Sequence, residues 1–383
     1  MLDIYAGATA LNTLKHAGLD QSRFNILLGA SGGPKWFVLY GLDRYLMNDF
    51  FKGRTTPLTL LGSSVGSFRA ACFAQKHPAA AIERLAKHYI ETTYGSKYVS
   101  PETVTESVRD IVDAMLGDDG VANILHNPVF KAHFIVARTH GLAASENRLL
   151  QGLGLLKSSR INKRSRSSLK EQYERFIFHP PDSTLSTDDP HNIPTQSVAL
   201  TEANTREAIL ASGSLPIIMQ GIRNIAGAAE GNYRDGGIVD YHFDLNVRGT
   251  NSTAYDSANE TTGVNSQAAT SDTTIDSSHD ELILYPHFSA GLRAGWFDKK
   301  LPRLVKPEHY ERVVLLCPSQ AFIKNLPYGK IPDRSDFSKL DTESRKKFWW
   351  RAANDSEQLA EEFAQFIQNP DWTRVRPITD LTG

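Results

Sequence analysis

Toward the N-terminus, short apolar runs that end at glycine-rich turns alternate with amphipathic segments. The runs at 25–28 and 58–61 each end at a glycine and are typical of buried strands. Between them, apolar side chains recur at helical spacing from 38 to 46, and residues 67–76 are predicted to form the next helix. Two such strands joined by a helix make a right-handed βαβ unit. The chain is therefore predicted to begin as a parallel α/β sheet.

The rest of the chain continues this alternation, with one compositional break. The pattern predicts helices at 80–94, 102–116 and 201–211, and strands at 134–137, 195–200, 282–285 and 313–316. Residues 247–280 are dominated by Ser, Thr, Asn, Asp and Ala, so we expect a disordered surface insertion there. At the C-terminus, residues 341–369 are expected to form a helical segment with one apolar stripe.

Composition narrows the class of protein. The 383 residues suggest one large domain or two ordinary ones. A formal net charge of -1 predicts no nucleic-acid partner in the absence of a local basic patch. The two cysteines, Cys72 and Cys317, exclude a disulfide framework and a zinc cluster, and nothing implies a metal or cofactor. The N-terminus lacks the pattern of a secretory signal and no run of about 18 apolar residues occurs. We therefore expect a cytoplasmic protein.

The clearest chemical motif is Gly62-Ser63-Ser64-Val65-Gly66, a G-x-S-x-G between a predicted strand and a predicted helix. That context is the one a nucleophile elbow requires. A side chain at Gly62 or Gly66 would clash with neighbouring elements, and the central Ser64 would point outward near a helix N-terminus. The match alone is weak, because an ordinary strand-to-helix turn often contains glycine and serine. Its position after a buried strand favours the elbow.

A second glycine turn, from Gly29 to Lys35, follows the preceding strand. It is expected at the carboxyl end of the neighbouring strand, the edge where open α/β sheets bind ligands. Adjacent Gly32 and Gly33 allow two backbone N–H groups to point at one oxygen, as in an oxyanion hole, with Lys35 beside them. A P-loop is disfavoured, since Pro34 removes an N–H and Trp36 replaces the Mg²⁺-binding Ser or Thr.

A third motif, Asp235-Gly236-Gly237, places a carboxylate before two glycines. On its own it is most simply a D-G turn. Together with the two preceding motifs, it indicates a backbone segment that must approach another segment closely.

Together these motifs resemble the patatin-like phospholipases, which are α/β lipid acyl hydrolases with a Ser–Asp dyad. A fourth block, Ala211-Ser212-Gly213-Ser214-Leu215-Pro216, is similar to the family's A-S-x-[SA]-x-P segment. The resemblance covers roughly 25–240, and four ordered blocks are more specific than any one of them. It implies a three-layer α/β hydrolase fold with a mainly parallel central sheet and helices on both faces, as a single domain over 1–383.

The resemblance also implies a chemistry. Ser64 would be the nucleophile and Asp235 its general base, with Gly32, Gly33 and Lys35 at the oxyanion hole and Gly62 and Gly66 shaping the elbow. The implied activity is that of a phospholipase A-type hydrolase that cleaves lipid esters through an acyl-enzyme, without a cofactor. The glycine turn departs from the family pattern, since Ser31 replaces a glycine and Trp36 a small residue.

Two other functions stay open at this stage. One is a Ser–His–Asp esterase, with His242 or His287 as the histidine. The other is a non-catalytic lipid-binding protein on the same fold. The partner is expected to be a lipid or ester, and a basic cluster offers a surface for anionic membrane headgroups: Arg160, Lys163, Arg164, Arg166 and Lys170. A solvated flexible loop is the favoured interpretation of that cluster.

Overall fold

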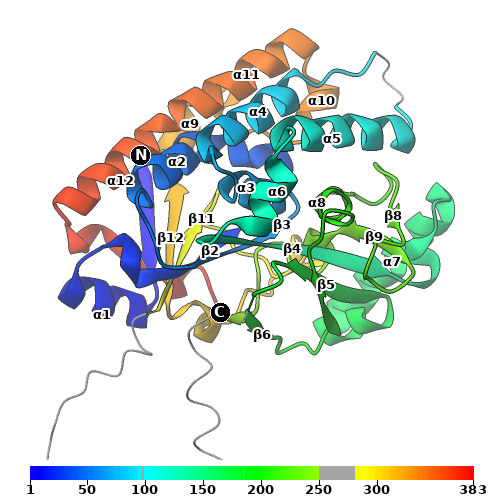
Figure 1. Cartoon of the computed structure of the whole chain (residues 1–383), viewed down its shortest axis with the longest axis horizontal. Helices are drawn as coiled ribbons and strands as arrows, with labels where there is room; N and C mark the ends of the chain where they lie inside the picture. The colour runs from blue at the N-terminus through cyan, green and yellow to red at the C-terminus, as the bar shows by residue number, and fades with distance from the viewer. Residues whose placement is uncertain (96–98, 184, 250–280) are drawn as a thin grey trace, which may run out of the picture.

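A mixed sheet runs through the molecule and carries strands from both ends of the chain (Figure 1). The computed structural model describes residues 1–95, 99–183, 185–249 and 281–383. The central strands are parallel in the order β12-β11-β2-β3-β4, and antiparallel pairs occur mainly toward the edges. This confirms the predicted α/β fold with a mainly parallel central sheet. The strands of this sheet are β1 (Leu2–Ala6), β2 (Phe24–Gly29), β3 (Leu58–Ser63), β4 (Phe130–Thr139), β5 (Tyr173–His179), β7 (Thr195–Ala199), β8 (Ile222–Arg223), β9 (Asn232–Asp235), β11 (Leu282–Pro286), β12 (Val313–Pro318) and β13 (Val375–Pro377).

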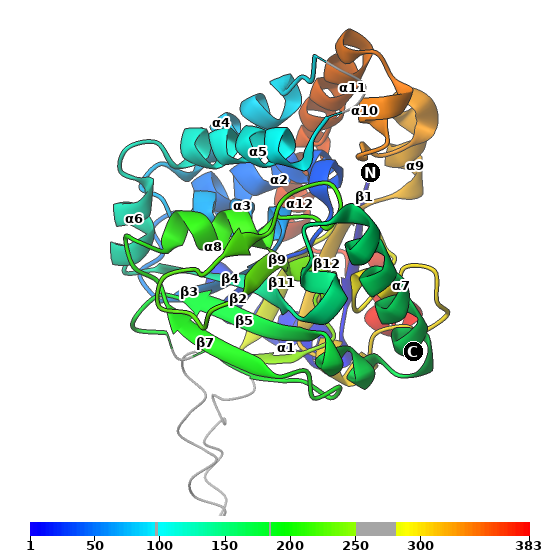
Figure 2. The same cartoon turned by 90° about the vertical axis from the view of Figure 1, so that its right-hand side faces the viewer.

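Most helices gather on one face of the sheet, and α1 lies on the other side (Figures 1 and 2). The helix α3 packs directly on the strands β3 and β4, and α4 packs on α3 through its buried apolar positions Ala81, Ile82, Leu85, Ala86 and Ile90. The helices are α1 (Ala8–Ala17), α2 (Tyr40–Tyr45), α3 (Val65–Phe73), α4 (Pro78–Glu91), α5 (Pro101–Leu116), α6 (Gly120–His126), α7 (Arg148–Arg164), α8 (Thr205–Ser212), α9 (Gln320–Asn325), α10 (Asp336–Lys339), α11 (Thr342–Asp355) and α12 (Glu357–Gln368).

Three segments differ from the sequence-based expectation. The helix expected at 38–46 is divided into a 3₁₀ helix (Gly33–Leu39), α2 and a π-helical turn (Leu46–Phe50). The basic segment 158–170 is not a flexible loop but the end of α7 followed by a 3₁₀ helix (Arg166–Glu171). Its order comes from buried polar contacts, such as those of Arg166 with Asp298, which polarity alone does not reveal. The C-terminal segment 341–369 is helical, as expected, but it is divided into two helices, α11 and α12.

The predicted insertion at 247–280 lies almost wholly outside the described residues. At its start the prediction is wrong, because Val247 and Arg248 belong to β10 (Asn246–Arg248), which pairs with β6 (Ser186–Asp188). The buried side chain of Val247 explains the ordered backbone at this point.

Two strands meet end to end along one edge of β4, and this positions the site. The parallel strand β3 ends with Ser63 beside Ile135. The antiparallel strand β9 arrives from the opposite direction and ends with Asp235 beside Val136, the next residue of β4. The residues that follow β3 and end β9 are therefore brought to one point, although they lie far apart in the chain.

Candidate active site

The turn after β3 holds Ser64 in a conformation that few residues adopt. Its φ and ψ angles are 56° and −127°, a sparsely populated region that costs about 1–3 kcal/mol for a residue with a side chain. The flanking glycines make the turn feasible. A Cβ atom at Gly66 would overlap the carbonyl group of Gly29, and one at Gly62 would overlap the backbone of Gly66. This is the geometry of a nucleophile elbow, with β3 before it and α3 after it.

The hydroxyl of Ser64 donates a hydrogen bond to Asp235. The distance from Ser64 Oγ to Asp235 Oδ2 is 2.7 Å, and both residues are buried. The other carboxylate oxygen, Oδ1, accepts a hydrogen bond from the backbone N–H of Gly237 at 2.7 Å. The structure thus joins the two residues for which the resemblance implies a dyad, and it fixes the orientation of the carboxylate.

Two opposing influences act on the pKa of the Asp235 carboxyl group. Burial raises the pKa of its carboxyl group, because an ionised carboxylate loses its hydration. The positive charge of Arg334, the hydrogen bonds from Ser64 and Gly237, and the charge of Lys299 act to lower the pKa. A carboxylate in this position is a stronger base than a solvated one and still has cations that favour its ionised form.

The fourth sequence block connects both halves of the site. The hydroxyl of Ser212 accepts a hydrogen bond from the backbone N–H of Ser64 at 3.0 Å and donates one to the carbonyl of Ile135 at 2.6 Å. The carbonyl of Ser214 accepts the backbone N–H of Asp235 at 3.0 Å. The end of α8 and the turn after it therefore hold the elbow and the acidic strand in register.

The glycine turn after β2 lies beside the elbow that holds Ser64. Gly32 precedes the 3₁₀ helix and Gly33 begins it with φ 55°, so neither N–H has an acceptor within that helix. Gly33 lines the same cavity as Ser64. Beneath Gly32 lies the ring of Phe288, which leaves no room for a Cβ atom there. These features suit a close approach of backbone to a bound group.

The other residues of this turn contact side chains close to the site. The ammonium group of Lys35 lies 5.0 Å from the centre of the Phe288 ring, and the residue as a whole is half-buried. Ser31, which replaces a family glycine, donates a hydrogen bond to Ser63 at 2.9 Å. Trp36 is buried in the core and is not among the residues that line the described cavity, so its bulk leaves the cavity open.

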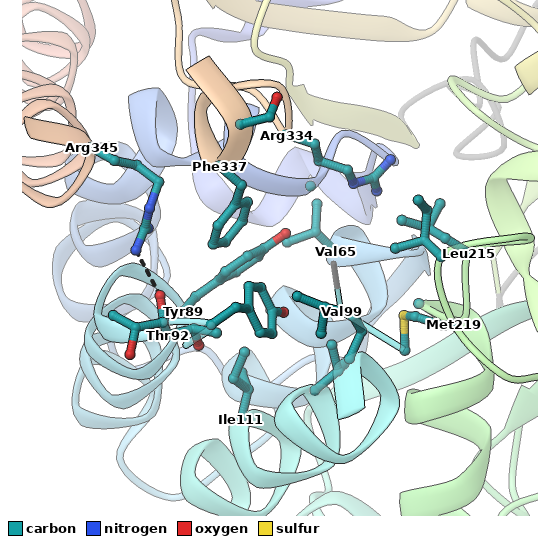
Figure 3. A pocket seen from close by; sticks show the side chains of 18 of the residues that line it. Val65, Tyr89, Thr92, Val99, Ile111, Leu215, Met219, Arg334, Phe337 and Arg345 are labelled. Atoms are coloured by element: carbon teal, nitrogen blue, oxygen red, sulfur yellow. Dashed lines mark hydrogen bonds between the residues drawn. The ribbon is translucent and has the colours of Figure 1, made fainter. Parts of the chain in front are cut away.

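Ser64 opens into a cavity of about 820 Å³ that is mostly apolar. This volume falls within the range of roughly 300–1,000 Å³ typical of small-molecule sites. Figure 3 shows Tyr89 and Phe337 on one side, Leu215 and Met219 opposite, and Ile111 at the base. The apolar wall comes from α3, α4, α5, the turn after α8 and the C-terminal segment, and it includes Val65, Phe68, Val99, Val104, Val108, Ile111, Ile217 and Leu340. The lining suits a hydrocarbon chain placed beside the serine hydroxyl.

Two cations at the site were not identified from the sequence. The guanidinium of Arg334 lies against Gly33 and lines the cavity with Ser64. Much of the Lys299 side chain is exposed, but its ammonium group lies 3.8 Å from the centre of the Tyr241 ring. Desolvation of that group, with the charges of Arg334 and Lys35, lowers the pKa of Lys299 to about 7. Both residues lie in the C-terminal part of the chain, outside every motif, so no local pattern pointed to them.

The two histidines considered for a triad pack around Phe288, whose ring lies beneath Gly32. His242 and His287 contact each other and the ring of Phe288. Burial lowers the pKa of His242 well below its usual range and lowers that of His287 to about 3, so both are neutral at neutral pH. Within the described residues, neither one lines the cavity or hydrogen-bonds to Ser64 or Asp235.

In the described ranges, no group of three or more His, Cys, Asp or Glu side chains is arranged to hold a metal ion. None of the helices seen there combines the length and apolarity needed to cross a bilayer.

Comparison with known proteins finds one family whose model matches part of the chain. Residues 52–242 match the family model described as Patatin-like phospholipase. The match includes Ser64 and Asp235, begins after the glycine turn of Gly32 and Gly33, and ends before Lys299 and Arg334. No curated protein and no solved structure matches the chain.

Proposed function

The chain carries a patatin-like phospholipase domain, and from this premise we propose that it is a serine lipid acyl hydrolase with a Ser64–Asp235 dyad. The observation that carries the proposal is the 2.7 Å hydrogen bond from Ser64 Oγ to Asp235 Oδ2 at the wall of a large apolar cavity. A nucleophile with a base in hydrogen-bond reach, next to an apolar cavity, suits the cleavage of an ester with a long acyl chain.

The first half-reaction forms an acyl-enzyme. Ser64 Oγ attacks the ester carbonyl carbon while its proton passes to Asp235 Oδ2. The N–H groups of Gly32 and Gly33 donate to the negative oxygen of the tetrahedral intermediate, and the charge of Arg334 adds to this stabilisation. The intermediate then expels the alcohol oxygen, which takes the proton from Asp235.

The second half-reaction restores the enzyme. A water molecule gives a proton to Asp235 and attacks the acyl carbon. When this second intermediate breaks down, Ser64 Oγ leaves and recovers the proton from Asp235, and the fatty acid is released. The single carboxylate thus transfers protons in both halves without a histidine.

The test is a hydrolysis panel of phospholipids and short-chain p-nitrophenyl esters, run together with labelling by a fluorophosphonate. Ser64→Ala and Asp235→Asn should lose hydrolysis, and Ser64→Ala should lose labelling. The matched control is Ser63→Ala, because that hydroxyl is adjacent in sequence and contacts Ser31 instead. Undiminished turnover by Ser64→Ala would refute the proposal.

The same panel separates the two alternatives. A triad enzyme would lose activity in His242→Ala or His287→Ala, whereas the proposed dyad retains it. A non-catalytic lipid-binding protein would show neither turnover nor labelling in the wild type. The substrate is proposed to be a lipid ester presented at a membrane surface, and the cytoplasmic location stays a prediction.

A further inference from the structure

The helix α7 (Arg148–Arg164) has its polarity reversed relative to an ordinary surface helix. Its buried residues are polar or small: Gln151, Gly154, Ser158 and Asn162. Its exposed side carries large apolar side chains, with Leu149 at 81% exposure, Leu153 at 56%, Leu156 at 46% and Leu150 at 44%. A surface helix normally buries its leucines, so an outer face of this kind indicates a partner that covers it.

Buried polar contacts hold the helix in this orientation. Ser158 is bonded to Tyr173 at 2.8 Å, and Asn162 donates to Asp298 at 2.8 Å. Gly154 lies against the backbone of Ala143 so closely that a Cβ atom there would clash. A rotation of the helix that hid the leucines would break these contacts and leave buried polar atoms without partners, which costs about 1–3 kcal/mol for each group.

The outer face continues into a basic stripe. Leu149, Leu153 and Leu156 are followed at helical spacing by Arg160, Lys163 and Arg164, and all three cations are exposed. Exposed leucines joined to arginine and lysine on one side of a helix match an interface with anionic lipid, in which the apolar residues enter the headgroup region and the cations meet phosphates. This charge pattern favours a lipid surface over a second copy of the chain.

The face is connected to the entrance of the proposed active site. Arg148, the first residue of α7, lines the cavity that contains Ser64, and so does Ile218, which is 51% exposed. Gln151 accepts a hydrogen bond from the backbone N–H of Ile217 at 2.5 Å and so ties the helix to that loop. The exposed Leu142, just before α7, extends the apolar surface. Figures 1 and 2 show α7 at the periphery of the molecule.

From these contacts we propose that the outer face of α7 is a docking surface for an anionic lipid bilayer, which it places at the mouth of the Ser64 cavity. The proposal rests on the proposed function only for the use of that docking, which would deliver a lipid ester to Ser64. Binding itself requires no hydrolysis.

The test measures flotation of the full chain with vesicles of phosphatidylcholine, with and without phosphatidylserine. The wild type should bind the anionic vesicles more strongly. Leu153→Asp should reduce binding roughly tenfold or more, because it places a charge in the apolar contact. The matched control is Gln365→Asp, which adds the same charge at an exposed position of α12, away from α7. Arg160→Gln with Arg164→Gln should remove the preference for phosphatidylserine.

Several results would overturn the proposal. Wild type that does not float with either vesicle contradicts it, as does equal loss in Leu153→Asp and Gln365→Asp. A dimer in sedimentation velocity that Leu153→Asp dissociates, without vesicle binding, would assign the face to a second copy of the chain. Thermal unfolding of each variant tests whether it is folded. Because flotation needs no turnover, failure of docking and failure of the Ser64 chemistry are observed separately.

Discussion

The hydroxyl of Ser212 accepts a hydrogen bond from the backbone N–H of Ser64, 148 residues earlier in the chain, at 3.0 Å. Because the same hydroxyl donates to the carbonyl of Ile135, it links the elbow to β4, the strand that both β3 and β9 adjoin. Ser212 is thus a positioning residue: it contacts the backbone that holds the proposed nucleophile and leaves the reacting atoms to Ser64 and Asp235.

Ser212→Ala removes one partner from two buried backbone groups. We expect the free energy of unfolding to fall by about 1–3 kcal/mol, and kcat for an ester to fall because the strained elbow loses a support. Urea unfolding and steady-state kinetics measure the two effects. Ser159→Ala, at an exposed position of α7, should change stability by no more than about 0.5 kcal/mol. A Ser212→Ala variant with wild-type stability and kcat would contradict this role.

The charge of Arg334 should set the acid limb of the pH–rate profile. Asp235 accepts a proton only when it is ionised, so the rate falls as the pH drops through its pKa. Arg334 lowers that pKa, so Arg334→Met raises it and moves the acid limb of kcat/KM toward higher pH. Arg334→Lys should restore part of the shift. An unmoved limb in Arg334→Met would show that the guanidinium does not act on Asp235.

The glycines of the chain should respond very differently to alanine. In Gly66→Ala the new methyl group overlaps the carbonyl of Gly29, so we expect a loss of at least about 3 kcal/mol or no folded protein. In Gly152→Ala, inside α7, the methyl group meets nothing within 4 Å, and the variant should gain about 0.5–1 kcal/mol through helix propensity. Expression yield and thermal unfolding compare the two. Similar stabilities would contradict the packing described at the elbow.

Filling the cavity should change acyl-chain preference. Val108 on α5 lines the cavity, and Val108→Trp takes up part of its volume. We expect kcat/KM for long-chain esters to fall roughly tenfold relative to short-chain esters, which corresponds to about 1.4 kcal/mol. Asp110→Trp, at an exposed position of the same helix, is the control. An unchanged ratio would show that the acyl chain binds elsewhere.

Local patterns in the sequence predicted much of the scaffold. Apolar runs gave the positions of β2, β3, β11 and β12, since buried parallel strands require continuous apolar residues. The helical stripes of α4 and α5 were equally clear. The basic segment 158–170 was wrongly predicted to be a flexible loop, because its buried partners, such as Asp298, lie more than a hundred residues away in the sequence.

By itself, the sequence determined where the turns of the site lie, because G-x-S-x-G, the Gly32–Gly33 pair and D-G-G are local requirements for tight backbone. Only the tertiary structure decided that Ser64 and Asp235 meet, since this depends on β3 and β9 ending at consecutive residues of β4. It also decided the presence of Arg334 beside them and the outward leucines of α7. Those features arise from contacts between segments that are distant in sequence, and the spacing of residues along the chain does not reveal such contacts.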